Sequence, residues 1–138
     1  MHVIVMLDDA NGMMFNNRRQ SKDCVLRKDV LSDTRNAKLF MNEYSFKQFE
    51  EDATNIIVDN SFLEIAGMND YCFVENEHLN DFLDKICTIT IYRWNRMYPS
   101  DFIFDIAINE DEWTLKLSSE FEGKSHKKIT KEVWCKNE

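Results

Sequence analysis

Two basic side chains stand next to each other in a polar stretch near the N-terminus. Arg18 and Arg19 follow a pair of asparagines and precede Ser21, which can cap a helix that runs to about Leu31. Two guanidinium groups beside the free N–H groups of a helix start could hold a phosphate or a carboxylate. The alternative is a solvated cationic loop that pairs with surface acids, because basic loops without a ligand are common.

A second candidate lies at the end of an expected strand. The segment Tyr92–Pro99 contains three aromatic residues and two arginines, and such side chains together suit stacking on a base or ring. Strand alternation alone explains half of this pattern, because Tyr92 and Trp94 would point one way and Arg93 and Asn95 the other. Ligands of open α/β sheets bind beyond the carboxyl ends of strands, which favours a binding role here.

Other residues that could do chemistry carry weaker patterns. His126, with Ser125 and Lys128 beside it, could suggest acid–base chemistry, but a histidine in such a polar stretch is more often just exposed. A nucleophile needs a positioned base and an orienting third group, which the sequence alone does not show. Asp8 and Asp9 precede a turn and lack the spacing of a calcium loop. The four cysteines show no C-x-x-C pair, so we expect free thiols and no zinc, with Cys72 and Cys87 buried as small apolar side chains.

Composition limits the classes of partner. Acidic residues outnumber basic ones by 25 to 17, giving a formal net charge of −8. Such a surface argues against extended nucleic-acid binding and against an anionic membrane. The N-terminus reads as a strand, not as a signal peptide, and no apolar run approaches the roughly 18 residues of a membrane span. We therefore expect a cytoplasmic protein that binds a small molecule, with its oligomeric state left open.

The elements that must position these residues alternate along the first two thirds of the chain. Helices are expected from Ser21, from Ser45, from Ser61 to Gly67 and over Leu79–Ile86, the last being the clearest amphipathic pattern. Strands are expected at 3–7, 39–41, 55–58, 71–74 and 88–94, then without intervening helices at 102–106, 113–117 and 129–133. This order predicts an α/β fold over residues 1–138, with a mostly parallel, doubly wound sheet and an antiparallel C-terminal hairpin.

The order and spacing of these segments resemble dihydrofolate reductase over almost the whole chain. The segments that carry the resemblance are Val3–Met13, Lys38–Phe49, Asn55–Val58, Glu77–Tyr92, Trp113–Phe121 and Ile129–Trp134. The resemblance implies a dihydrofolate reductase-like sheet with a ligand pocket at the carboxyl ends of its strands.

Several phrases are also similar to a small family of uncharacterised Firmicute proteins, some of which are labelled ribonuclease Z. They are Phe15–Asp23, Met41–Ser45, Tyr71–Glu75, Tyr92–Arg96 and Ser125–Thr130. Ribonuclease Z holds two zinc ions with a His-x-His-x-Asp-His cluster. The three histidines of this chain, His2, His78 and His126, lie far apart, so metal-dependent ribonuclease activity is not expected.

Departures from the reductase pattern concern the cofactor. The family holds its cofactor phosphates with a Gly-Arg-x-Thr turn at the second helix, where this chain has Asn42-Glu43-Tyr44-Ser45. A Gly-Gly run that lets backbone approach the pyrophosphate is replaced by Glu75-Asn76-Glu77. Carboxylates there would repel a pyrophosphate. We therefore expect no nicotinamide cofactor.

One part of the family's substrate site has a counterpart. An acid on the family's first helix hydrogen-bonds the pteridine ring, and Asp23 is its nearest equivalent. We expect Asp23 to accept hydrogen bonds from an N–H-rich ligand and to share one pocket with Arg18, Arg19, Asn42 and Arg93. The full set of expected ligand-binding residues is Arg18, Arg19, Asp23, Asn42, Tyr44, Ser45, Glu75, Tyr92, Arg93 and Asn95.

Three functions fit these observations. The first is binding of a small polar or anionic ligand, of nucleotide or pterin type, without nicotinamide-dependent redox chemistry. The second is a degenerate reductase that still uses a nicotinamide cofactor, and the third is a protein-binding scaffold. The sequence leaves open whether any reaction is catalysed.

Overall fold

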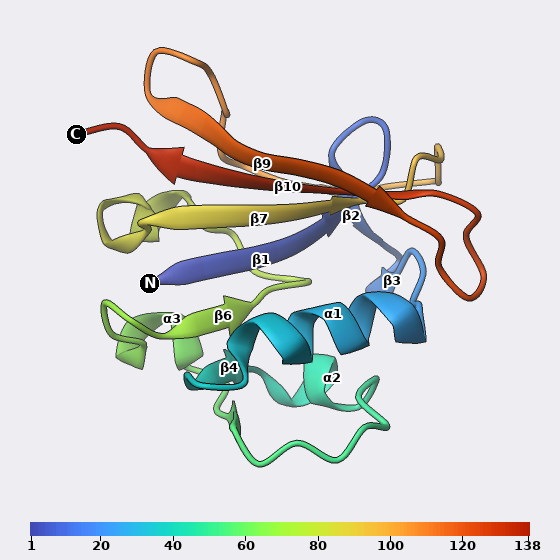
Figure 1. Cartoon of the computed structure of the whole chain (residues 1–138), viewed down its shortest axis with the longest axis horizontal. Helices are drawn as coiled ribbons and strands as arrows, with labels where there is room; N and C mark the ends of the chain where they lie inside the picture. Colours follow the sequence, from blue (N-terminus) through green and yellow to red (C-terminus); the bar gives the residue numbers. More distant parts are fainter.

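Seven strands form one sheet in the order β5-β4-β6-β1-β7-β10-β9 (Figure 1). The computed structural model describes residues 1–138. The strands are β1 (His2–Leu7), β4 (Leu39–Met41), β5 (Ile56–Val58), β6 (Tyr71–Phe73), β7 (Thr88–Arg93), β9 (Trp113–Phe121) and β10 (Ile129–Lys136). Neighbours from β5 to β7 are parallel, and β10 pairs antiparallel with β7 and β9. This confirms the expected mostly parallel sheet with an antiparallel C-terminal hairpin.

The central strand β1 is buried on both faces. Val3, Val5 and Leu7 belong to the core on one face, whereas Ile4 and Met6 belong to the core on the other. A strand covered on both sides needs a continuous apolar run in place of alternation. Full burial of each such side chain stabilises the fold by about 1.5–3 kcal/mol. A strand with apolar side chains on both faces therefore belongs in the centre of the sheet, where both faces are covered.

Helices cover the two faces of the sheet. On one face α1 (Cys24–Thr34) packs Leu26 and Val30 against the sheet, and on the other α3 (Phe62–Ile65) contributes Phe62 and Leu63. In Figure 1 α1 lies across the sheet in front of β6 and β4. The short helix α2 (Glu43–Phe46) follows directly on β4.

Three expected helices differ in the structure. The first begins at Cys24 with Asp23 as its N-cap, not at Ser21. The helix expected from Ser45 is α2, which begins at Glu43 with Asn42 as its N-cap. The amphipathic segment near residue 80 is a 3-10 helix, η1 (Asn80–Lys85), and not an α-helix. Apolar residues three apart also suit the threefold repeat of a 3-10 helix, so the pattern did not distinguish the two.

A hairpin that the sequence reading missed lies beyond the carboxyl end of β1 (Figure 1). It consists of β2 (Gly12–Phe15) and β3 (Arg18–Arg19), and it pairs with β8 (Phe102–Ile103) in a second sheet of order β3-β2-β8. Its two-residue turn, Asn16 and Asn17, has φ of 50° and 60°. Asparagine tolerates this conformation, which the favoured hairpin turns require. The strand expected over 102–106 is therefore limited to β8.

The cysteine predictions hold in part. All four thiols are free, and Cys72 is fully buried. Cys87 is exposed, because it lies at the surface just after η1 and is not part of a buried helix face. No helix in the structure combines the length and the apolar character that crossing a membrane requires.

Candidate functional site

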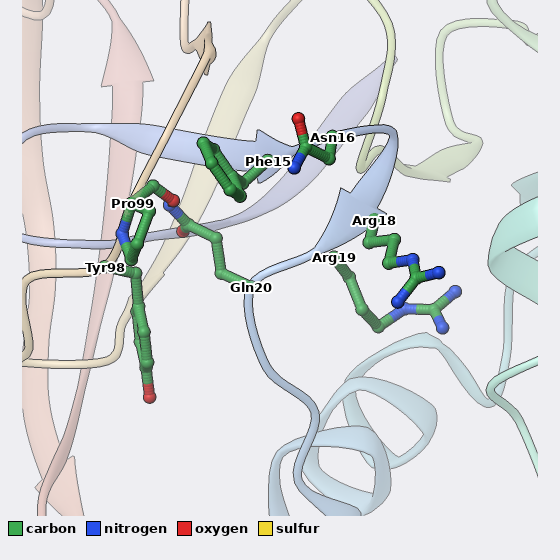
Figure 2. A pocket seen from close by; sticks show the side chains of 7 residues that line it. All are labelled: Phe15, Asn16, Arg18, Arg19, Gln20, Tyr98 and Pro99. Carbon is green, nitrogen blue, oxygen red and sulfur yellow. The ribbon is translucent and has the colours of Figure 1, made fainter.

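A cavity of about 550 Å³ opens between the β2–β3 hairpin and the segment that follows β7. Its lining residues are Phe15, Asn16, Arg18, Arg19, Gln20, Tyr98 and Pro99. Figure 2 shows Tyr98 and Pro99 on one side, the two arginines on the other and Gln20 between them. The cavity thus combines cationic, amide and aromatic groups, and two of its walls come from segments about 80 residues apart in the chain.

A buried carboxylate holds the two walls together. Asp8, at the end of β1, is fully buried, and its Oδ1 accepts hydrogen bonds from the N–H groups of Ala10 (2.9 Å) and Gly12 (2.7 Å). Its Oδ2 accepts from Gln20 Nε2 at 3.1 Å and from the N–H of Tyr98 at 3.2 Å. The expectation of turn chemistry for Asp8 is confirmed, and its second oxygen also fixes both sides of the cavity.

The two arginines have different partners. Arg19 forms a bidentate ion pair with the buried Glu75, with Nε–Oε2 at 3.0 Å and Nη2–Oε1 at 3.2 Å. Its guanidinium lies 4.4 Å from the centre of the Tyr44 ring and donates to the Tyr44 carbonyl, while the Tyr44 hydroxyl accepts from the Arg19 N–H. Arg18 is exposed and has no carboxylate within ion-pair distance. Arg18 is therefore the cavity's uncompensated positive charge.

The ends of β4 and β6 are tied directly to each other. Asn42 caps α2 by accepting from the N–H of Ser45 at 2.9 Å, and its Nδ2 donates to Asn76 Oδ1 at 2.8 Å. The Ser45 hydroxyl is buried and has no hydrogen-bond partner. Tyr44 and Glu75 contact Arg19. None of the four expected residues Asn42, Tyr44, Ser45 and Glu75 lines the cavity.

Three of the expected site residues point elsewhere. Arg93 pairs with Glu132 at 3.0 Å and also donates to Asn11, in a separate cavity. The Tyr92 hydroxyl donates to Asp29 of α1 at 2.5 Å. Asn95 donates to the Thr130 hydroxyl on β10 and to the carbonyl of Lys128, just before that strand. The expectation that Arg93 shares a pocket with Arg18 and Arg19 is therefore wrong, because Arg93 is held by Glu132 of β10.

Asp23 also departs from its expected role. Its carboxylate has no exposed surface and accepts from the N–H groups of Val25 (2.9 Å), Lys124 (3.0 Å) and Ser125 (2.9 Å). Burial by itself would raise the pKa of Asp23, but these hydrogen bonds together with one from His126 lower it well below its ordinary value. Asp23 is hence an ionised clamp between α1 and the loop before β10, and it does not face the cavity as a ligand acceptor.

Sequence reasoning also placed His126 wrongly. It is only 4% exposed, and its ring stacks on Trp94 with the centroids 4.4 Å apart. Its Nδ1 lies 3.2 Å from Asp23 Oδ2, and its Nε2 lies 3.1 Å from the hydroxyls of both Ser21 and Tyr98. These partners are 28 to 105 residues away in the chain, so no local pattern could have indicated them.

Comparisons with known proteins support the fold alone. No protein-family model matches the chain, and no curated protein matches it either. Among solved structures it is similar to a dihydrofolate reductase from Enterococcus faecalis, determined in complex with NADP(H) and RAB-propyl. The TM-score is 0.70 at 10% sequence identity, covering 99% of this chain and 96% of that chain. The dihydrofolate reductase-like fold is thereby confirmed, whereas the resemblance to the Firmicute family and its ribonuclease label gains no support.

The residues at the β4 and β6 ends do not fit a dinucleotide cofactor. At the position where the reductase pattern calls for glycines, the chain has Glu75, buried and engaged by Arg19. The hydrogen bond between Asn42 and Asn76 directly joins the segments that follow β4 and β6. A pyrophosphate placed there would meet a buried carboxylate and would have to break these contacts.

Proposed function

We propose that the chain binds a small polar molecule with an anionic group in the cavity beside the β2–β3 hairpin, without using a nicotinamide cofactor. The observation that carries this proposal is Arg18. Arg18 lines the cavity, and its guanidinium has no carboxylate partner, in a chain of net charge −8. In such a chain an anion needs a local positive site, and a guanidinium can bind phosphate or carboxylate with two parallel hydrogen bonds.

Other lining groups indicate the rest of the ligand. Gln20 also lines the cavity, and its side-chain amide is fixed by the hydrogen bond that its Nε2 donates to Asp8. Phe15 and the Tyr98 ring offer apolar surface to a planar group. Small-molecule sites commonly have volumes of about 300–1,000 Å³, and this cavity lies within that range. These features support a ligand of nucleotide or pterin type.

The proposal can be tested by isothermal titration with inorganic pyrophosphate as the probe anion. We expect saturable binding that Arg18→Ala weakens at least about tenfold, which corresponds to about 1.5 kcal/mol for a charge-assisted hydrogen bond. Arg35→Ala is the matched control, since Arg35 is an exposed arginine at the far end of α1. Absence of binding, or an equal loss in both variants, would contradict the proposal.

The degenerate-reductase alternative predicts a different result. Fluorescence titration with a reduced nicotinamide cofactor would then give micromolar affinity that survives Arg18→Ala, because binding would depend on the β4 and β6 ends. We expect no such affinity, because Glu75 and the Asn42–Asn76 hydrogen bond occupy that region.

A further inference from the structure

Ser21, His126 and Asp23 form a continuous hydrogen-bonded series next to the cavity. Ser21 Oγ lies 3.1 Å from His126 Nε2, and His126 Nδ1 lies 3.2 Å from Asp23 Oδ2. We propose that these three side chains are a nucleophilic triad, in which Ser21 attacks an ester or thioester whose anionic end is held by Arg18. This inference rests on the proposed function, since the cavity must bring the substrate to Ser21.

The orientation of His126 follows from its neighbours. Because the Asp23 carboxylate is ionised, it can only accept, so a hydrogen bond between the two side chains requires a proton on Nδ1. In the tautomer that carries its only proton there, Nε2 presents its lone pair to the hydroxyls of Ser21 and Tyr98. The stack on Trp94 and the burial of the ring prevent it from turning away. A base oriented by a third group is what activation of a serine requires.

The serine directly follows a residue that lines the cavity and is not itself a lining residue. Ser21 is half-buried and follows Gln20, which lines the cavity. Tyr98, another lining residue, places its hydroxyl 3.1 Å from the same Nε2, so the imidazole lies directly behind the cavity wall. The N–H groups of Ser21 and Lys22 donate to no backbone carbonyl, and such N–H groups can stabilise a developing oxyanion.

The proposed reaction balances with water as the only co-reactant. Ser21 Oγ forms a bond to the carbonyl carbon while its proton passes to His126 Nε2. The alcohol or thiol then leaves and takes up that proton, which gives an acyl ester on Ser21. Water attacks this ester, His126 accepts the water proton, and the proton returns to Ser21 Oγ as the carboxylic acid leaves. Asp23 stays ionised throughout.

The alternative is that these contacts only hold the loop before β10 onto α1. The two possibilities differ in the reactivity of Ser21, which a purely structural network would not raise. The experiment treats the wild-type chain with phenylmethylsulfonyl fluoride, whose sulfur forms a bond to a reactive serine oxygen as fluoride leaves. Proteolysis and tandem mass spectrometry then give the labelling rate of each serine, and the exposed Ser32 of α1 serves as internal control.

We expect Ser21 to be labelled at least about 100-fold faster than Ser32, since a positioned general base contributes about 10²–10⁴ in rate. His126→Gln should lower the Ser21 rate at least tenfold, with folding checked by circular dichroism. Equal rates at Ser21 and Ser32 in the wild-type chain would overturn the proposal, even if His126→Gln does not fold. An undiminished rate in a folded His126→Gln chain would also overturn it.

The pyrophosphate titration separates this proposal from the function on which it rests. If pyrophosphate binds through Arg18 but Ser21 is not labelled, the binding site stands and the triad is wrong. If Ser21 is labelled selectively but no anion binds, the triad stands and the anionic nature of its substrate is wrong.

Discussion

Arg19 and Glu75 form a bidentate ion pair that separates the roles of two adjacent arginines. Glu75 is buried, and the contacts of 3.0 and 3.2 Å hold the Arg19 guanidinium against the end of β6. Its neighbour Arg18 has no such partner. The same pair places a carboxylate where a dihydrofolate reductase-like fold would need glycines for a cofactor phosphate. This one ion pair thus leaves Arg18 as the free charge of the anion site and disfavours a cofactor phosphate at the end of β6.

Removing the charge of Glu75 should strengthen anion binding. Glu75→Gln releases Arg19 from its ion pair and eliminates a negative charge behind the cavity. We expect the affinity for pyrophosphate to rise severalfold in isothermal titration. We also expect the free energy of unfolding to fall by about 1–3 kcal/mol, because a buried charged partner is lost. Unchanged or weaker binding in a folded Glu75→Gln chain would show that Glu75 does not compete with the ligand for Arg19.

The clamp at Asp23 predicts a pH dependence of stability. The folded-state pKa of Asp23 is lowered, so its stabilising contribution is fully present above the unfolded-state pKa of about 3.9 and is lost progressively as pH falls from there through the folded-state pKa. Asp23→Asn should lower the free energy of unfolding by about 2–3 kcal/mol at pH 5. Urea denaturation should show this difference from the wild-type chain shrinking between pH 5 and pH 2.5. A difference that stays constant would mean that the charge is not what stabilises the clamp.

A glycine beside the clamp should resist substitution. A Cβ at Gly123 would lie 2.5 Å from Asp23 Oδ2 and 2.8 Å from Ile129 Cδ1. Both atoms are held in place, so Gly123→Ala should lower the free energy of unfolding by about 1–3 kcal/mol. Gly67→Ala is the control, because its Cβ would come no closer than 3.3 Å to the Asp70 side chain. Equal effects of the two substitutions in thermal denaturation would contradict this reading of the packing.

The sheet could be predicted because its signals are local. The apolar run of β1 and the alternation that leads to β9 and β10 require nothing from distant residues. The start of α1 was harder, since Ser21 and Asp23 are both good capping residues. The choice of Asp23 depends on N–H groups at Lys124 and Ser125, about 100 residues away.

The site was predictable only in part, because many of its contacts join residues that lie far apart in the chain. The basic pair in the hairpin was recognised from composition, but the sequence could not reveal that Glu75 neutralises Arg19 while Arg18 stays free. His126 was expected to be exposed because its neighbours in sequence are polar. Its burial follows from Trp94 and Tyr98 on a different segment. The Asn16-Asn17 pair, whose residues both have positive φ in the structure, was a local signal for the hairpin, and it was missed.

The different roles of Arg18 and Arg19 can be measured directly by following arginine Nε–Hε resonances in NMR spectra during titration with inorganic pyrophosphate. We predict a saturable shift of the Arg18 resonance, with the Arg19 resonance changing little because Glu75 retains its Nε–H. Arg35, at the far end of α1, should not respond. An unmoved Arg18 resonance, or shifts of equal size at Arg18 and Arg35, would contradict an anion site in this cavity.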